Sequence, residues 1–223
     1  RGWESHMFDL GLVIAFAGIV GGRLWDVFFF DWEYYHNHLL EIPYIWQGGM
    51  AIQGGIIFAC IAAYFYLKKH QIPVLPFADT VTPGIILGQA IGRIANFMNG
   101  DAFGHPTGQD FGLLYPDTTL AYHTYGAQPL WPAEVWECQG DLLIFVLLLW
   151  YGCKTRAEGT TFCLYIMFYS LLRFFLENYR GDYGTLALGL KSAQLTSLAA
   201  FAGAFILFLY FHFKHKSKSG ISE

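Results

Sequence analysis

Six long apolar segments constrain this chain more than any other feature of its sequence. A helix needs about 20 mostly apolar residues to cross the hydrocarbon core of a bilayer. Of the 223 residues, 55% are hydrophobic and 13% are charged, about half the charged share of a soluble domain. The sequence therefore predicts an all-α, polytopic integral membrane protein. The six expected spans are residues 8–30, 49–67, 74–98, 138–153, 160–179 and 193–213.

The lysines and arginines predict the direction in which the chain crosses the membrane. Short loops rich in these residues stay on the cytoplasmic side. We therefore expect the acidic and aromatic loops to face outward, and residues 99–137, rich in Gly, Pro, Tyr and Asp, to form a small outward-facing cap between spans. The basic residues that gather at alternate ends of the spans are Arg1, Lys68, Lys69, Lys154, Arg156, Lys214, Lys216 and Lys218.

Residues 1–223 are expected to form a single membrane-embedded domain that carries this cap. The first residues lack the basic head, apolar stretch and cleavage site of a signal peptide. Because Arg1 is expected in the cytoplasm, the whole protein is predicted to have one more span before it, which makes seven. The four cysteines have no paired spacing and predict neither a disulfide framework nor a zinc site. A net charge of -4 gives no argument for nucleic-acid binding.

Charged residues within the expected spans are the strongest functional signal. A charge at the bilayer centre costs about 2.5–3.5 kcal/mol on insertion scales. Arg93 and Asn96 share one helix face with Gly100, and Arg173 shares another with Glu177. Arginine's planar fork fits a phosphate or carboxylate, so the two faces predict an anion site. The remaining members of this charged set are Arg23, Asp26 and Asp79, with Tyr169 and Arg180 on the stripe of Arg173.

A static buried network is the alternative reading of these charges. Arg173 and Glu177 are four residues apart and neutralise each other in that case, while Arg93 pairs with Asp79 or Asp101. Arg23 and Asp26, three residues apart, are an ordinary helix pair on the same reading. Asp141 and Lys191 lie near the ends of spans and are expected to be solvated.

Four blocks of the sequence resemble bacterial prolipoprotein diacylglyceryl transferases. The most specific block is GQAIGRIANFMNGDAFG at residues 88–104. The other three follow in the same order and spacing as in that family, and together the blocks extend over nearly the whole chain. They are IWQGGMAIQGG at residues 45–55, PAEVWE at 132–137 and RFFLENYR at 173–180.

The resemblance implies an enzyme of the bacterial inner membrane with seven spans and its N-terminus outside. Such an enzyme transfers the diacylglyceryl group of phosphatidylglycerol to the thiol of the lipobox cysteine in a preprolipoprotein signal peptide. The transfer forms a thioether and releases glycerol phosphate. No metal or organic cofactor is implied, and the expected partners are phosphatidylglycerol, signal peptides and membrane lipids.

By the same resemblance, two arginines grip the lipid phosphate while Asn96 and Gly104 shape the site and Glu177 orients the arginines. The expected catalytic residues are Arg93, Arg173, Asn96, Glu177 and Asp101. The expected phosphatidylglycerol-binding residues are Arg93, Arg173, Arg23, Gly104, Asn99, Gln53, Tyr169, Arg180 and Glu134.

The chain departs from the family pattern at several of these positions. Gln53 stands where many members have histidine, the natural proton acceptor near neutral pH. The identity of the base therefore stays open between Glu134, Asp101, His105 and Glu177. Two alternative functions also stay open: a non-catalytic relative that binds lipid or signal peptide, and a transporter that uses the intramembrane charges. The other departures are Asp101 for Glu, His105 for Arg, Ala95 for Gly, and Trp131, Glu134 and Trp136 for His, Gln and Tyr.

Overall fold

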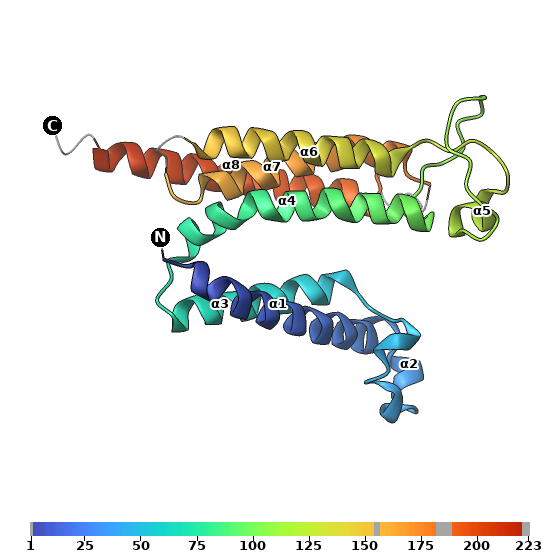
Figure 1. Ribbon diagram of the computed structural model, residues 1–223, viewed down its shortest axis with the longest axis horizontal. Coiled ribbons are helices and arrows are strands. Elements are labelled where there is room, and N and C mark those ends of the chain that lie inside the picture. Colours follow the sequence, from blue (N-terminus) through green and yellow to red (C-terminus); the bar gives the residue numbers. More distant parts are fainter. Residues whose placement is uncertain (1, 154–156, 182–188, 220–223) are drawn as a thin grey trace. The chain divides into compact units, whose positions relative to one another are not determined.

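The computed structural model shows a helical chain in two compact units, residues 1–74 and 75–223 (Figure 1). It describes residues 2–153, 157–181 and 189–219, with side chains as far as 216. Within those ranges no strand forms, and only isolated bridges occur, such as the one between Gly104 and Arg180. The all-α prediction is confirmed. Several of the basic residues that predict the orientation lie outside the described residues, namely Arg1, Lys154, Arg156 and the side chain of Lys218.

The first unit is a pair of packed helices joined by an irregular loop. Gly21 and Gly54 meet where the helices cross, and a Cβ on either would collide with the backbone of the other. Small residues at such crossings let helix backbones approach closely in lipid. The elements of this unit are α1 (Glu4–Trp25), a π-helical turn (Asp26–Phe30), α2 (Trp32–Tyr35), two 3-10 turns (Leu39–Glu41 and Ile45–Gln47) and α3 (Ile52–Lys69).

The second unit is a bundle in which α4, α6, α7 and α8 run side by side (Figure 1). Its apolar core joins Ile86 of α4 to Ile144 and Leu148 of α6, and α7 packs against them through Leu164 and Phe168. Its elements are α4 (Val74–Asn99, whose first residue belongs to the first unit), α5 (Leu120–Tyr125), α6 (Ala133–Gly152), α7 (Thr160–Leu176), a 3-10 turn (Glu177–Tyr179) and α8 (Ser192–Ser219).

The segment 99–137 has a small core of its own. Phe103, Ala121 and Leu130 are buried there, with Tyr115 and Tyr125 packed against them. The segment is therefore a folded element that connects α4 to α6. That it faces outward is still a prediction.

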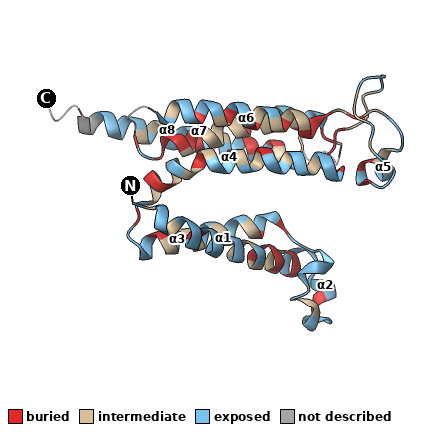
Figure 2. Ribbon diagram, in the orientation of Figure 1, coloured by how far each residue is buried: buried red, intermediate tan, exposed pale blue. Residues whose placement is uncertain are grey.

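Within the described residues, four helical stretches are long and apolar enough to cross a membrane, and they mark this as a multi-pass membrane protein. Much of the helix surface in both units is exposed (Figure 2), and large apolar side chains such as Phe16, Ile52 and Ile206 contribute to it. The two other predicted spans are helical as α3 and α6, and their crossing stays a prediction. The four stretches are Glu4–Phe30, Val74–Asn99, Thr160–Tyr179 and Ser192–Lys216.

Asp79 joins two helices of the bundle. Its carboxylate accepts the backbone N–H of Gly159 at 2.6 Å and that of Phe162 at 2.9 Å, at the start of α7. The N-terminal N–H groups of a helix lack partners within the helix and favour negative charge. Asp79 is thus a cap of α7, and the expected pairing of Arg93 with Asp79 was wrong.

Candidate functional site

Glu137, on α6, lies at the centre of a cluster of arginines. Its Oε1 is 2.9 Å from Nη2 of Arg93, and its Oε2 is 3.3 Å from Nη1 of Arg173. Nη1 of Arg180 is 3.8 Å from the same Oε2, and the Tyr169 hydroxyl donates to Oε1 at 3.4 Å. One carboxylate therefore gathers three guanidinium groups, one from α4 and two from the region of α7 and the turn that follows it.

Three helices carry the members of this cluster. Arg93 lies on α4, Glu137 on α6 and Arg173 on α7, and the apolar core between these helices fixes the distance across which the charges meet. Glu177 follows α7, and its Oε2 is 2.9 Å from Nη2 of Arg173, so this expected i, i+4 pair is confirmed. Arg173 is thus held between two carboxylates.

The cluster has a partly exposed side. Its ion pairs join three guanidinium groups to two carboxylates. The carboxylates of Glu137 and Glu177 are 0% exposed, whereas the side chains of Arg93 and Arg173 are 20% and 14% exposed. Charge-assisted, two-pronged hydrogen bonds suit guanidinium groups to phosphate. The arrangement can therefore bind an anion at the accessible side of these two arginines.

Asn96 and Asp101 extend the cluster along α4. Arg93 donates to Oδ1 of Asn96 at 3.2 Å, and Nδ2 of Asn96 donates to Oδ1 of Asp101 at 2.7 Å. Asp101 thus orients the amide of Asn96. It does not form the ion pair with Arg93 that the static network required. Asn99, at the end of α4, is exposed.

The turn after α7 is held by polar contacts from the start of α8. Nζ of Lys191 donates to the backbone carbonyls of Glu177 at 2.8 Å and Arg180 at 2.6 Å. Nε2 of Gln194 donates to Oδ1 of Asn178 at 3.1 Å. The prediction that Lys191 is simply solvated was wrong, because its ammonium group satisfies the carbonyls at this helix end.

Gly104 lies where only a glycine fits. A Cβ at this position would collide with the backbone and side chain of Trp131. The rings of Trp131 and Trp136 both pack against the ring of Tyr179. Their centroids are 5.3 Å and 5.2 Å from the Tyr179 centroid. The two tryptophans that depart from the family pattern therefore take part in packing beside the arginine cluster.

Glu134 lies one helical turn before Glu137 and is also 0% exposed. Its Oε1 accepts a hydrogen bond from the hydroxyl of Tyr115. Burial at the start of α6, before the expected span, raises the pKa of Glu134 to about 7. The N–H of Glu134 itself and the guanidinium groups of Arg180 and Arg93 oppose this rise, and Asp101 adds to it. Glu134 is thus an acid that titrates near neutral pH.

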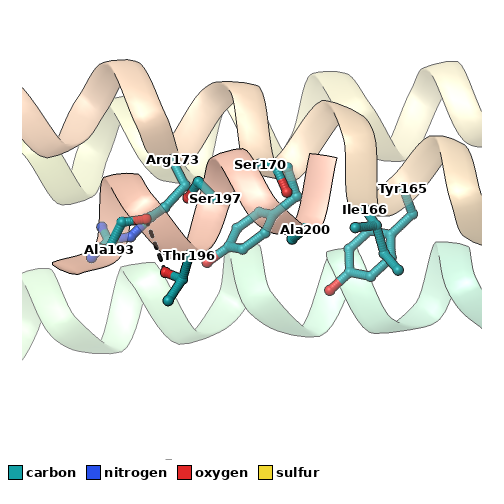
Figure 3. A pocket seen from close by; sticks show the side chains of 9 residues that line it. Tyr165, Ile166, Ser170, Arg173, Ala193, Thr196, Ser197 and Ala200 are labelled. Atoms are coloured by element: carbon teal, nitrogen blue, oxygen red, sulfur yellow. Dashed lines mark hydrogen bonds between the residues drawn. The ribbon is translucent and has the colours of Figure 1, made fainter. Parts of the chain in front are cut away.

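A cavity of about 310 Å³ opens beside Arg173, between α7 and α8. Figure 3 shows Tyr165 and Ser170 of α7 on one side of it and Thr196, Ser197 and Ala200 of α8 on the other. Mixed apolar and hydroxyl side chains next to an arginine suit a ligand with an apolar part and an anionic part.

Arg23 has a different environment, in the first unit. Its guanidinium group donates to the backbone carbonyls of Ile42 at 2.7 Å, Gly48 at 2.7 Å, Gly49 at 3.0 Å and Glu41 at 3.1 Å. These contacts hold the loop between α1 and α3. Nη1 is 4.0 Å from Asp26, so the helix pair is present.

Gln53 is exposed in the first turn of α3, also in the first unit. The structure therefore brings together Arg93, Arg173, Arg180, Glu177, Asn96, Asp101, Tyr169, Gly104 and Glu134 in the second unit. That Arg23 and Gln53 contribute to the same site stays a prediction.

Sequence reasoning missed Glu137 as a site residue, and it missed Asp141. Asp141 is fully buried, so the prediction that it is solvated was wrong. Glu134, Glu137 and Asp141 recur at i, i+3 and i+7 on one face of a largely apolar helix, which was the available signal. Within the described residues, no group of three or more His, Cys, Asp or Glu is placed to hold a metal ion.

The fold and the cluster together define a class: a multi-pass membrane protein with arginines and carboxylates gathered inside a helical bundle. The sequence profile of the prolipoprotein diacylglyceryl transferase family matches residues 1–210. The chain belongs to this family.

Three relatives named phosphatidylglycerol–prolipoprotein diacylglyceryl transferase illustrate the similarity. The protein of Geobacillus kaustophilus (strain HTA426) is 38% identical over 201 residues, which are 89% of this chain and 74% of that protein. The protein of Clostridioides difficile (strain 630) is 35% identical over 221 residues, 99% of this chain and 83% of its own length. The protein of Thermosynechococcus vestitus (strain NIES-2133 / IAM M-273 / BP-1) is 37% identical over 215 residues, which are 94% of this chain and 79% of that protein.

Proposed function

We propose that this protein transfers the diacylglyceryl group of phosphatidylglycerol to the lipobox cysteine of preprolipoproteins. The cysteine sulfur attacks the glycerol carbon that carries the phosphate, a C–S bond forms, the C–O bond to the phosphate breaks, and glycerol phosphate leaves. The observation that carries this proposal is the buried Glu137 that holds Arg93, Arg173 and Arg180 around one point. Membership of the family supports the same chemistry.

Charge gathers on the phosphate as the C–O bond breaks, and the arginines stabilise it. Arg93 and Arg173, the two partly exposed members, bind the phosphate oxygens. Donors that are already aimed at the developing charge cost no reorganisation when the reaction occurs. Glu137 and Glu177 provide this preorganisation for Arg173, and Asn96 with Asp101 provides it for Arg93.

The remaining predicted site residues have supporting roles in this proposal. Tyr169 and Arg180 complete the hydrogen bonding of Glu137, and Gly104 lets the loop after α4 approach Trp131. Asn99, exposed at the end of α4, meets phosphatidylglycerol as the lipid approaches the cluster.

We place the protein in the bacterial inner membrane as a single embedded domain with six helices crossing. The loops rich in lysine and arginine lie in the cytoplasm, and the segment 99–137 faces outward to meet the signal peptide. Four sufficiently apolar helical stretches support the spanning part of this arrangement. The separate small core of the segment supports its role as a cap.

Turnover by the reconstituted full-length protein tests the proposal. The protein is placed in phosphatidylglycerol vesicles with a synthetic lipobox peptide, and released glycerol phosphate is measured. We expect release by the wild type and a fall of about 100- to 1000-fold for Arg173→Ala, the effect of removing one transition-state donor. Lys214→Ala, which removes an exposed cation on α8, is the matched control and should not change the rate.

Two results would contradict the proposal. Wild-type protein that binds phosphatidylglycerol but never releases glycerol phosphate would indicate a lipid-binding relative. Equal release by wild type and Arg173→Ala would show that the arginine cluster does not take part.

A further inference from the structure

Glu134 is a buried carboxyl group without an ion-pair partner in the described part of the chain. Its Oε1 accepts a hydrogen bond from the Tyr115 hydroxyl. Its Oε2 has no hydrogen-bond partner among the described residues. Burying such a group costs free energy unless it is fully paired. Its position one turn from Glu137 places it next to the proposed reaction centre, and a role in the chemistry explains its presence there despite that cost.

Two of the other candidate acceptors near the cluster are engaged elsewhere. Glu177 pairs with Arg173, and Asp101 accepts the amide of Asn96. Nδ1 of His105 donates to the carbonyl of Pro106 at 2.9 Å, so Nε2 keeps its lone pair and His105 stays the second candidate base. Gln53 cannot take a proton at all.

Asp141 is buried on the same helix face as Glu134, but no described hydroxyl or amide reaches its carboxylate. Glu134 differs because Tyr115 connects it to the surface. The Tyr115 ring belongs to the segment 99–137 and is only half-buried, so its hydroxyl gives the buried carboxylate a route outward.

We propose that Glu134 accepts the proton of the attacking cysteine through the Tyr115 hydroxyl. This inference rests on the proposed function. The thiol proton passes to the Tyr115 oxygen as the Tyr115 proton passes to Oε1 of Glu134. The C–S bond forms, the C–O bond breaks, and its electron pair leaves with the phosphate, so no further reactant is needed.

The electrostatic setting agrees with this role. General bases work best when their pKa lies near the operating pH, and burial raises the pKa of Glu134 to about 7. The charged groups that face it are Arg180 and Arg93, which favour its ionised form, and Asp101, which disfavours it. The carboxylate is the active form, so turnover should rise with pH through about 7.

The pH dependence of turnover by Glu134→Gln tests the inference. The amide keeps the size of the side chain and an oxygen for the Tyr115 hydroxyl, but it cannot accept a proton. At pH 7 we expect a loss of about 100-fold or more, the contribution of a general base. The rate of the variant should rise only as the peptide thiol ionises, near its ordinary pKa of about 8.5, so the loss should shrink at pH 9.

Tyr115→Phe is the second variant, because it leaves Glu134 in place and removes the connecting hydroxyl. We expect it to lose about 10-fold or more at pH 7 and to show the same high-pH recovery. Binding to phosphatidylglycerol vesicles serves as a fold control and should match the wild type. Thermal unfolding midpoints correct the rates for the folded fraction, because Tyr115→Phe removes a hydrogen bond from a buried carboxyl group.

The outcomes separate this inference from the proposed function. A wild type that releases no glycerol phosphate contradicts the proposed function itself. If the wild type is active and both variants keep its pH profile, the inference is overturned. A lower unfolding midpoint with an unchanged pH profile per folded protein also overturns it, because Tyr115 and Glu134 would then only anchor the cap.

Discussion

Arg23 in the first unit and Arg93 in the second are both arginines in helices that are apolar enough to span a membrane, yet their neighbours differ. Arg23 donates to five backbone carbonyls at 2.7–3.5 Å, and its side chain is 4% exposed. Arg93 meets the Glu137 carboxylate and the Asn96 amide, and its side chain is 20% exposed. Backbone carbonyls of one loop take up the guanidinium group of Arg23, whereas side chains meet that of Arg93 and leave it more exposed.

The comparison teaches that an intramembrane arginine does not by itself mark a binding site. What distinguishes the two is which groups satisfy the donors and whether any side stays accessible. Buried ion pairs are weak evidence for stability, since removing charges from water is costly. The proposed function accounts for their retention around Arg93, whereas the contacts of Arg23 are those of a residue that holds a loop.

Among the changes that test this comparison, the largest effect is expected for Arg93→Lys. Lysine keeps the positive charge but replaces the two-pronged fork by a single ammonium group. We expect kcat/KM for glycerol phosphate release to fall by about 100-fold, with the unfolding midpoint little changed. A variant that keeps wild-type turnover would show that Arg93 is only part of a static network.

Arg23→Lys should lower the stability of the protein and leave its turnover unchanged. An ammonium group has fewer donors than the guanidinium fork and leaves buried carbonyls of the loop unsatisfied. The expected cost is about 1–3 kcal/mol of unfolding free energy, measured by thermal unfolding of the full-length protein in detergent. Turnover per folded protein should stay close to the wild type. If turnover falls while stability is unchanged, Arg23 binds phosphatidylglycerol, as the sequence predicted.

The smallest effect is expected for Asp79→Asn. Asp79 caps α7 and belongs neither to the loop contacts of Arg23 nor to the cluster of Arg93. The amide keeps one acceptor for the backbone N–H groups at the start of α7 but loses the second acceptor and the negative charge. We expect a loss of about 0.5–1 kcal/mol in stability and no change in turnover per folded protein. Asp110→Asn, at an exposed position of the cap, is the matched control. A larger loss of turnover than of stability would place Asp79 in the reaction.

The sequence by itself determined the helical, membrane-spanning character of the chain and the faces on which its charges lie. Both follow from local rules, because hydropathy over about 20 residues and a period of 3.6 residues need no knowledge of distant contacts. The pairing of Arg173 with Glu177 could be predicted for the same reason, since the two residues are four apart on one helix.

Only the tertiary structure decided which charges meet across helices. Glu137 lies 44 positions after Arg93 and 36 before Arg173, and its role depends on how α4, α6 and α7 are rotated against one another. The same holds for Asp79, whose partners on α7 are 80 and 83 positions away. Arg23 turned toward a loop because the backbone there offers carbonyls, and no periodic pattern encodes that conformation. The period of a helix gives the face of each residue, whereas packing gives its partner.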